Sequence, residues 1–257
     1  MSDAPAPDQF EALRARPRRL LVVLPHPDDE SYGLAGTLCR AADDPDAAVV
    51  LMTLTRGEAA VAGLERGQTP EEQGMERSDR MRRVAEIIGL DALILRDWPD
   101  RNLAFIDPRP VEAEVRDVLR ALRPNVLITF GARGINAHPD HIATHGIVRR
   151  AVLECRDEDP AIARRFATVT VPQSVADSID RLLFGTPDDQ VGCVLDVAPW
   201  AERKEECLVI HEAYVTVTGD GSDGRIARPP VEFLRLWDEP LPNGPLGDVF
   251  EGLETHE

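Results

Sequence analysis

The sequence has few of the features that mark membrane-spanning, disulfide-linked or cysteine-ligated proteins. No uninterrupted apolar segment approaches the ~20 residues that a helix needs to cross a bilayer. Residues 1–17 are rich in Ala, Pro and Asp and have no apolar core, which predicts a disordered tail rather than a signal peptide. The four cysteines lie far apart without a Cys-x-x-Cys pair, so we expect reduced thiols in a cytoplasmic protein and no cysteine-based zinc site.

Positive charge is also scarce. The 257 residues include 29 basic and 46 acidic side chains, which gives a formal net charge of −17. Nucleic acids and anionic membranes are polyanions, so neither is expected as a partner, although the acidity alone also serves solubility. The apolar content of 43% can fill a sizeable core, which favours one large α/β domain over residues 18–250.

Short apolar runs alternate with helical patterns along this domain. All-apolar runs are typical of parallel strands buried on both faces, whereas apolar residues spaced by three or four indicate helices. We expect strands at residues 20–24, 48–53, 92–95, 126–130, 168–171 and 191–197. We expect helices at residues 31–42, 75–88, 110–122, 139–154 and 200–214. The alternation predicts a Rossmann-like, mostly parallel sheet flanked by helices, with its active site at the carboxyl ends of the strands.

Polar clusters follow four of these strands and are therefore expected at one edge of the sheet. They are His26-Pro27-Asp28-Asp29-Glu30, Thr55-Arg56-Gly57-Glu58, Asp97-Trp98-Pro99-Asp100 and His138-Pro139-Asp140-His141. A catalytic zinc ion takes three protein ligands and keeps one position for water, and two histidines with one aspartate would serve. The first and last clusters therefore make a metal-dependent hydrolase the leading interpretation.

The last cluster also predicts its own local structure. Pro139 suits the first turn of a helix, which makes His138 the N-cap and places His141 one turn further along. Asp140 lies in that first turn, where the helix dipole favours an anion. We expect Asp140 to keep His138 charged enough to act as an acid, with a simple helix-terminal charge as the alternative.

Substrate-binding candidates come from the two middle clusters. Arg56 is expected to hold a substrate oxygen and Glu58 a hydroxyl group, and Asp100 is a further candidate of the same kind. The alternative is that these charges only face solvent. His145 is expected outside the ligand set because three histidines on one helix would be crowded, and His211 is either structural or at the rim of the site.

At these residues the sequence resembles the zinc-dependent LmbE-like, or PIG-L, de-N-acetylases. This family includes the N-acetylglucosaminyl-phosphatidylinositol enzyme and bacterial deacetylases and amidases of mycothiol and bacillithiol metabolism. The resemblance rests on Pro25-His26-Pro27-Asp28-Asp29-Glu30 and on Ala137-His138-Pro139-Asp140-His141, and it extends over residues 20–214. It implies a hydrolase that binds one zinc ion per chain, with iron(II) as an alternative metal, and family members form homo-oligomers.

The resemblance also implies roles for individual residues. The zinc ligands of the family are matched by His26, Asp29 and His141. Asp28 matches the general base, and His138 matches the catalytic histidine that stabilises the oxyanion or protonates the leaving amine, with Asp140 as its partner. Residues 53–58 match a segment that contacts substrate.

The implied reaction is removal of an N-acetyl group from a small molecule that contains N-acetylglucosamine, of the GlcNAc-malate or GlcNAc-inositol type. Zinc lowers the pKa of bound water towards ~7, and Asp28 takes a proton from it. The alternatives are an amidase that cleaves a thiol conjugate and a non-catalytic protein that binds zinc and sugar.

Three departures from the family pattern bear on specificity. Asn136 stands where some relatives carry a tyrosine, and Arg77 is followed by Arg80 rather than by glutamate three residues later. His211-Glu212-Ala213-Tyr214 departs from the usual His-x-Ser-Gln ending.

Overall fold

A seven-stranded mixed sheet forms the centre of the computed structural model, which describes residues 7–179, 182–211, 230–241 and 243–253. The strands lie in the order β3-β2-β1-β4-β5-β7-β6. Their bounds are β1 (Arg18–Leu24), β2 (Ala47–Thr53), β3 (Ala92–Leu95), β4 (Val126–Phe130), β5 (Arg165–Thr170), β6 (Cys193–Asp196) and β7 (Val231–Trp237). Strands β1 to β5 are parallel to one another, and β7 runs antiparallel to both β5 and β6.

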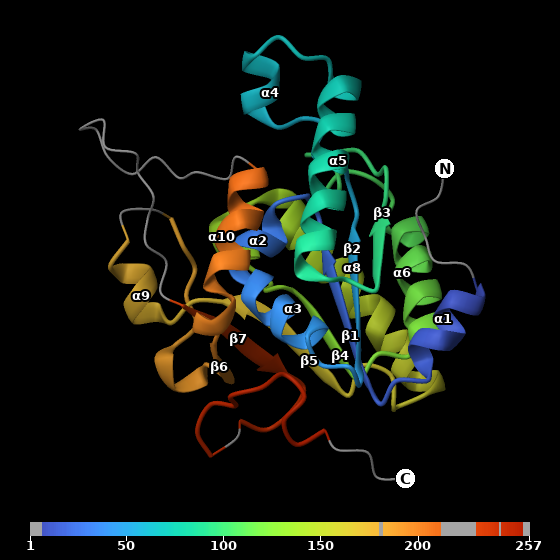
Figure 1. Ribbon diagram of the computed structural model, residues 1–257, viewed down its shortest axis with the longest axis vertical. Helices are drawn as coiled ribbons and strands as arrows, with labels where there is room; N and C mark the ends of the chain where they lie inside the picture. The colour runs from blue at the N-terminus through green and yellow to red at the C-terminus, as the bar shows by residue number, and fades with distance from the viewer. Residues whose placement is uncertain (1–6, 180–181, 212–229, 242, 254–257) are drawn as a thin grey trace.

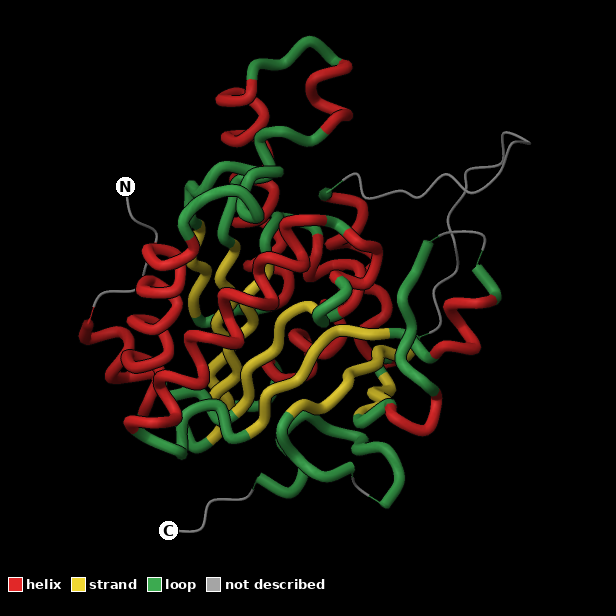
Figure 2. The backbone as a smooth tube through the Cα atoms, turned by 180° about the vertical axis from the view of Figure 1, so that it is seen from behind, coloured by secondary structure: helices red, strands yellow, loops and turns green. Residues whose placement is uncertain are grey.

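Helices cover both faces of this sheet (Figures 1 and 2). They are α1 (Pro7–Arg14), α2 (Asp29–Gly33), α3 (Ala35–Ala42), α4 (Val61–Glu65), α5 (Pro70–Ile88), α6 (Pro108–Leu122), α7 (Gly134–Ala137), α8 (Pro139–Glu158), α9 (Gln173–Asp177) and α10 (Ala201–Ile210). Apolar residues of α3, α5 and α10 pack on one face, and those of α1, α6 and α8 pack on the other.

Strand β1 explains why an all-apolar run is required at the centre. Leu20, Val22 and Leu24 belong to one apolar cluster, whereas Leu21 and Val23 belong to the cluster on the opposite face. Successive side chains of a strand point to opposite faces, so a strand covered by helices on both sides has no position for a polar residue. The run therefore stays apolar until β1 ends at the edge of the sheet.

The order of the strands places a switch point next to β1. The chain runs from β1 to β2 and β3 on one side, and then returns to place β4 on the other side of β1. Connections that leave in opposite directions open a crevice at the carboxyl ends of the two strands, where ligands bind in sheets of this kind. The segments that follow β1 and β4 flank that point.

The predicted mostly parallel sheet flanked by helices is confirmed, and the differences are local. The expected helix over residues 31–42 is two helices, α2 and α3, which meet at Leu34 (φ −140°). Helix α5 begins earlier than predicted, because a Thr69–Glu72 capping box satisfies its first backbone N–H groups. Strand β7 was not predicted, and the expected end of the last helix at residue 214 lies outside the described residues.

The prediction of a disordered tail over residues 1–17 is wrong for Pro7–Arg14, which form α1. Phe10 and Leu13 give this short helix an apolar side, and both are buried in the cluster on the α6 face. That burial outweighs the polar composition that suggested a tail. Within the described part of the chain, no helix combines the length and the apolar character that crossing a membrane requires.

Candidate active site

His26 is held between carboxylates from three segments of the chain. It lies two residues beyond β1, and its Nδ1 atom is 3.2 Å from Oδ2 of Asp29. Its Nε2 atom lies 3.2 Å from Oδ1 of Asp100, which follows β3, and 3.3 Å from Oδ2 of Asp140, in the first turn of α8. Burial opposes protonation of His26, but the carboxylates outweigh it and raise the pKa of the imidazole well above its usual value.

His141 is oriented by a carbonyl group and an aromatic ring. Its Nδ1 lies 3.0 Å from the oxygen of Gly134, which can only accept, so Nδ1 is the donor and Nε2 is free to bind a metal. Its ring stacks on Phe130, with 3.9 Å between the ring centroids. Gly134 has φ +60°, and a Cβ there would lie 2.8 Å from Cβ of His141, so the close approach requires glycine.

Asp29 brings the two histidines together. Its Oδ1 atom is 3.3 Å from Nε2 of His141, while its Oδ2 atom faces Nδ1 of His26. Burial opposes ionisation of Asp29, but His141 and His26 outweigh it and lower the pKa of the carboxyl group. Two ligands of a tetrahedral ion with bonds of about 2.05 Å are separated by roughly 3.3 Å, so this spacing fits a divalent cation.

Two overlapping groups of donor atoms surround this centre. In each group the donor atoms lie within 4.8 Å of one another, and the groups are His26, His138, His141 and His26, Asp100, Asp140. In His26 and His141 the ring nitrogen that is turned away from Asp29 has an acceptor of its own. The acceptor is a carboxylate for His26 and a carbonyl for His141. Such partners fix the ring orientation in metal sites. The residues therefore could hold one metal ion.

His138 is the half-exposed member of the cluster. As predicted, it caps α8, and its Nδ1 accepts the backbone N–H of Asp140 at 3.2 Å. Burial, His26 and His141 together lower the pKa of His138. The neutral ring must then carry its proton on Nε2, because Nδ1 is an acceptor.

Asp140, the expected partner of His138, contacts that ring through its backbone N–H and not through its carboxylate. The carboxylate of Asp140 instead accepts the backbone N–H groups of Arg101 at 2.6 Å and Leu103 at 3.1 Å, and faces His26. The loop after β3 thus holds the Asp140 carboxylate. Asp140 acts to raise the pKa of His138, as expected, but burial, His26 and His141 outweigh it.

Asp28 lies beside the cluster in a strained conformation. It has φ +112° and ψ −26°, and Oδ2 is 3.3 Å from a guanidinium nitrogen of Arg77 on α5. Burial raises the pKa of Asp28, and Arg77 opposes that rise. Non-glycine residues adopt positive φ rarely, and such residues cluster at functional sites.

The three expected substrate-binding residues have different surroundings. Arg56 forms ion pairs with Asp97 at 2.6 Å and Glu71 at 3.2 Å. Glu58 Oε1 accepts the backbone N–H of Asp100 at 2.8 Å, while buried Oε2 has no hydrogen-bond partner within the described chain. Asp100 is already engaged by His26 and by the backbone N–H of Ala59, so it supports the histidine.

His145 and His211 are buried away from the donor atoms. His145 donates from Nδ1 to the carbonyl of Phe130 at 2.8 Å and packs near Phe166 and Trp237, so it is structural. His211 contacts Glu30. Sequence reasoning gave no role to Glu30 or Arg77. For Arg77 a signal was present, because it shares its side of α5 with the buried residues Gly74 and Met81, three and four positions away.

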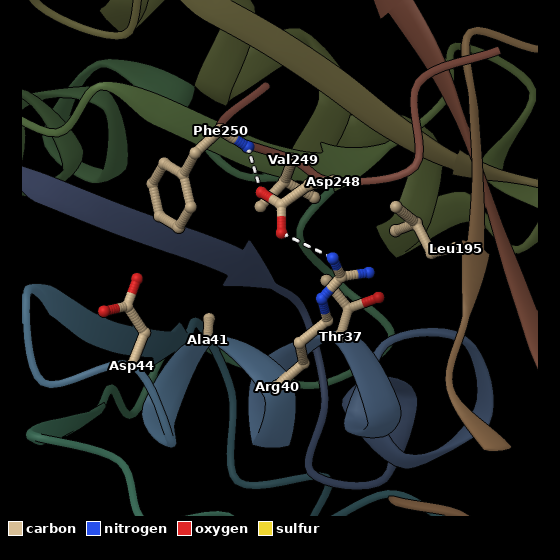
Figure 3. A pocket seen from close by; sticks show the side chains of 8 residues that line it. All are labelled: Thr37, Arg40, Ala41, Asp44, Leu195, Asp248, Val249 and Phe250. Atoms are coloured by element: carbon tan, nitrogen blue, oxygen red, sulfur yellow. Dashed lines mark hydrogen bonds and ion pairs between the residues drawn. The ribbon is translucent and has the colours of Figure 1, made fainter. Parts of the chain in front are cut away.

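Two cavities lie elsewhere, towards the amino-terminal ends of the strands. One, of about 210 Å³, is lined by residues that include Arg40 of α3 and Asp248 (Figure 3). The other, of about 540 Å³, is lined by residues that include Arg18, Asn125 and Asp248. None of the candidate site residues lines either cavity.

The chain is similar to known proteins over most of its length. Residues 21–152 match the family model described as PIG-L, GlcNAc-PI de-N-acetylase. A 1D-myo-inositol 2-acetamido-2-deoxy-alpha-D-glucopyranoside deacetylase of Thermomonospora curvata is 31% identical, over 79% of this chain and 83% of that protein. Deacetylase 1 of the same description from Frankia casuarinae is 27% identical, over 93% of this chain and 96% of that protein.

One structural neighbour shares the fold at low identity. The crystal structure of GalB, the 4-carboxy-2-hydroxymuconate hydratase of Pseudomonas putida KT2440, aligns with a TM-score of 0.62 and 18% identity. The alignment covers 90% of this chain and all of that one (100%). At that identity the likeness concerns the α/β architecture, which therefore supports more than one chemistry.

Proposed function

Because the chain belongs to the GlcNAc-PI de-N-acetylase (PIG-L) family and is a hydrolytic deacetylase, we propose that it removes the N-acetyl group of a small N-acetylglucosaminide. Among these, the GlcNAc-inositol type named for its relatives is the favoured substrate class. One observation carries the proposal: Asp28 stands directly before Asp29, whose two carboxylate oxygens face His26 and His141. A carboxylate beside a metal site, and not itself a ligand, is placed to act as a base.

The proposed metal is zinc, held by His26, Asp29 and His141, with iron(II) as the alternative. When bound, it supplies Lewis acidity and lowers the pKa of water towards ~7. Asp28 then accepts a proton from the attacking water. Its position beside Arg77 fixes the carboxylate while burial keeps its affinity for a proton above that of an exposed aspartate.

His138 is the proposed oxyanion donor. With Nδ1 occupied by the Asp140 N–H, the neutral ring presents Nε2–H, which can donate to the oxygen of the tetrahedral intermediate. Because the pKa of His138 is lowered, this role does not require a charged ring. Protonated Asp28 then returns its proton to the leaving amine, so that acetate and the free amino sugar depart.

Glu58 supports an amino-sugar substrate. Its buried Oε2 atom lacks a partner in the described chain, and an unpaired buried carboxylate oxygen favours a hydroxyl donor. We assign the sugar hydroxyls to Glu58 and retain Arg56 as a second contact. The proposal takes residues 18–250 as one cytoplasmic catalytic domain that acts on a small molecule and forms homo-oligomers.

The test is acetate release from a panel that contains GlcNAc-inositol, GlcNAc-malate and an S-conjugated N-acylated thiol. Wild type is compared with Asp28→Ala and with the control Asp44→Ala, an aspartate at the other edge of the sheet. Metal content is measured in each. We expect equal metal content, and a fall in kcat of about 10²–10⁴-fold for Asp28→Ala alone.

Other outcomes would identify the alternatives. Release of an acylated thiol product with no acetate from the sugars would establish the conjugate amidase. Metal and sugar binding without turnover of any substrate would establish the binding protein and end the deacetylase proposal.

A further inference from the structure

The backbone of Asp28 is held on both sides of the bond that defines its unusual φ. The carbonyl of Pro27 accepts a hydrogen bond from Arg77, and the N–H of the same peptide group, on Asp28, donates to Oε2 of Glu30 at 3.0 Å. The carbonyl of Asp28 accepts the N–H of Ser31 at 3.0 Å. Rotation about the N–Cα bond of Asp28 therefore has a fixed group at each end.

Glu30 is in turn held by His211. The two side chains are 0% and 1% exposed, and Nε2 of His211 lies 2.8 Å from Oε1 of Glu30. Ser31 donates its hydroxyl to the same oxygen at 2.6 Å, so the Oε2 atom that binds the Asp28 N–H is left in one position. His211 directly follows α10, a helix that packs against α2, α3 and α5.

The metal-binding side chains have other supports. His26 is oriented by Asp100 and Asp140, and His141 by Gly134. The described contacts of Glu30 and His211 include none with the side chains of His26, Asp29 or His141. Loss of the His211–Glu30 contact is therefore expected to free the backbone N–H of Asp28, with the Arg77 ion pair as the remaining support of its carboxylate, while the histidines keep their places.

We propose that His211, acting through Glu30, is a positioning residue that holds Asp28 in its left-handed conformation so that its carboxylate faces the reacting water. This inference rests on the proposed role of Asp28 as the base. Neither His211 nor Glu30 touches substrate. Without the contact, Asp28 relaxes towards negative φ, which moves its carboxylate, and a misplacement of about 1 Å can cost about 10²-fold in rate.

The test uses two amides that differ in reach. In His211→Gln the side-chain N–H₂ lies near the former Nε2 position and can still donate to Glu30, whereas in His211→Asn it stops near Nδ1. The control is Lys204→Met on α10, which breaks a buried ion pair with Glu232 of β7 and has no described contact with Glu30. Each variant is assayed for kcat and KM of acetate release, for melting temperature and for metal content.

We expect His211→Asn to lower kcat by about 10- to 100-fold with KM and metal content within about twofold of wild type. His211→Gln should recover most of the loss. Lys204→Met should lower the melting temperature without a comparable fall in kcat. The visible spectrum of the cobalt(II)-loaded protein should be the same in wild type and both His211 variants, because it reports the metal ligands.

Crystal structures of the two amide variants give a readout that is independent of activity. The proposal predicts that φ of Asp28 becomes negative in His211→Asn and remains positive in His211→Gln. It is overturned if Asp28 keeps positive φ in both, if kcat is unchanged in His211→Asn, or if Lys204→Met loses as much kcat. If wild type releases no acetate while φ of Asp28 responds as predicted, the proposed function fails and the structural coupling stands.

Discussion

The two edges of the sheet carry charged side chains in opposite ways. At the amino-terminal edge two ion pairs, Arg18–Asp44 at 2.6 Å and Arg40–Asp248 at 2.9 Å, are partly exposed, and each joins one basic group to one carboxylate. At the carboxyl-terminal edge a single buried imidazole, that of His26, faces three carboxylates within 3.3 Å. In the first arrangement each negative charge has a positive partner, whereas in the second the carboxylates outnumber the positive groups that face them.

The difference distinguishes acidic residues that only form surface ion pairs from the buried carboxylates around His26, which favour a bound cation. Exposed pairs contribute little to stability, since solvent screens them. Buried carboxylates are costly unless a positive charge accompanies them, and a bound cation is the strongest local charge that a site can contain. A large cavity lies at the amino-terminal edge, yet the groups of donor atoms that could hold a metal lie at the carboxyl-terminal edge.

Removal of the metal should have the largest effect. Chelation is expected to abolish acetate release and to lower thermal stability, because the carboxylates around His26 lose their counter-charge. With free metal at about 100 times Kd, the lost stabilisation is about 2.7 kcal/mol. Calorimetry with and without chelator, followed by addition of zinc or iron(II), measures both effects. Activity and melting temperature that are insensitive to chelation would contradict the contrast between the edges.

Asp140→Asn should weaken metal binding. The N–H groups of Arg101 and Leu103 bind different oxygens of Asp140, so the amide can still accept only one of them, and it removes one negative charge from beside His26. Loss of such a partner typically costs about 10–100-fold in metal affinity. Competition with a chromogenic chelator measures this, with Asp44→Asn as the matched control from the opposite edge.

His145 should make stability depend on pH although it lies outside the metal site. Burial lowers its pKa in the folded state, so the unfolded chain binds the proton more readily. This contribution to stability is complete above the unfolded pKa of about 6.5 and is lost as pH falls towards the folded pKa. Urea titrations of metal-loaded wild type should lose up to ~1.4 kcal/mol per pH unit more than those of His145→Asn. Equal slopes would refute this assignment.

Arg40→Ala should have the smallest effect. It removes the exposed pair with Asp248 seen in Figure 3 and is expected to cost less than ~1 kcal/mol of stability. Denaturant titration and the acetate assay check it together. A loss of activity here would mean that the amino-terminal edge also takes part in function, and the comparison would have to be withdrawn.

The sequence predicted the elements whose pattern is local. Apolar runs predict strands β1 to β4, since each of these strands is covered on both faces. Strand β7 alternates between buried and half-buried residues, but its buried side includes Glu232, whose partner Lys204 lies on another element. A glutamate breaks the apolar pattern that predicts a buried strand, and its burial can be explained only once its partner is known.

The candidate site was predicted as a set but not in its orientation. The sequence predicted that the four clusters lie at one edge of the sheet. It also predicted that Asp140 is the partner of His138 and that Asp100 binds substrate. Their actual positions depend on the loop after β3, where Glu58 holds the backbone of Asp100 and two N–H groups hold Asp140. Backbone conformations such as φ +57° at Ile135 are also set by tertiary contacts, and propensity gives no sign of them.

The separation of the site residues along the chain has a consequence for the order of folding. His26 and Asp140 are 114 residues apart, and β1 and β4 must pair before they can meet. Closing so long a segment lowers the entropy of the chain, and this loss is offset only when non-local contacts such as the β1–β4 pairing have formed. Metal is therefore expected to bind tightly only once the centre of the sheet has formed, slowing unfolding far more than it speeds folding.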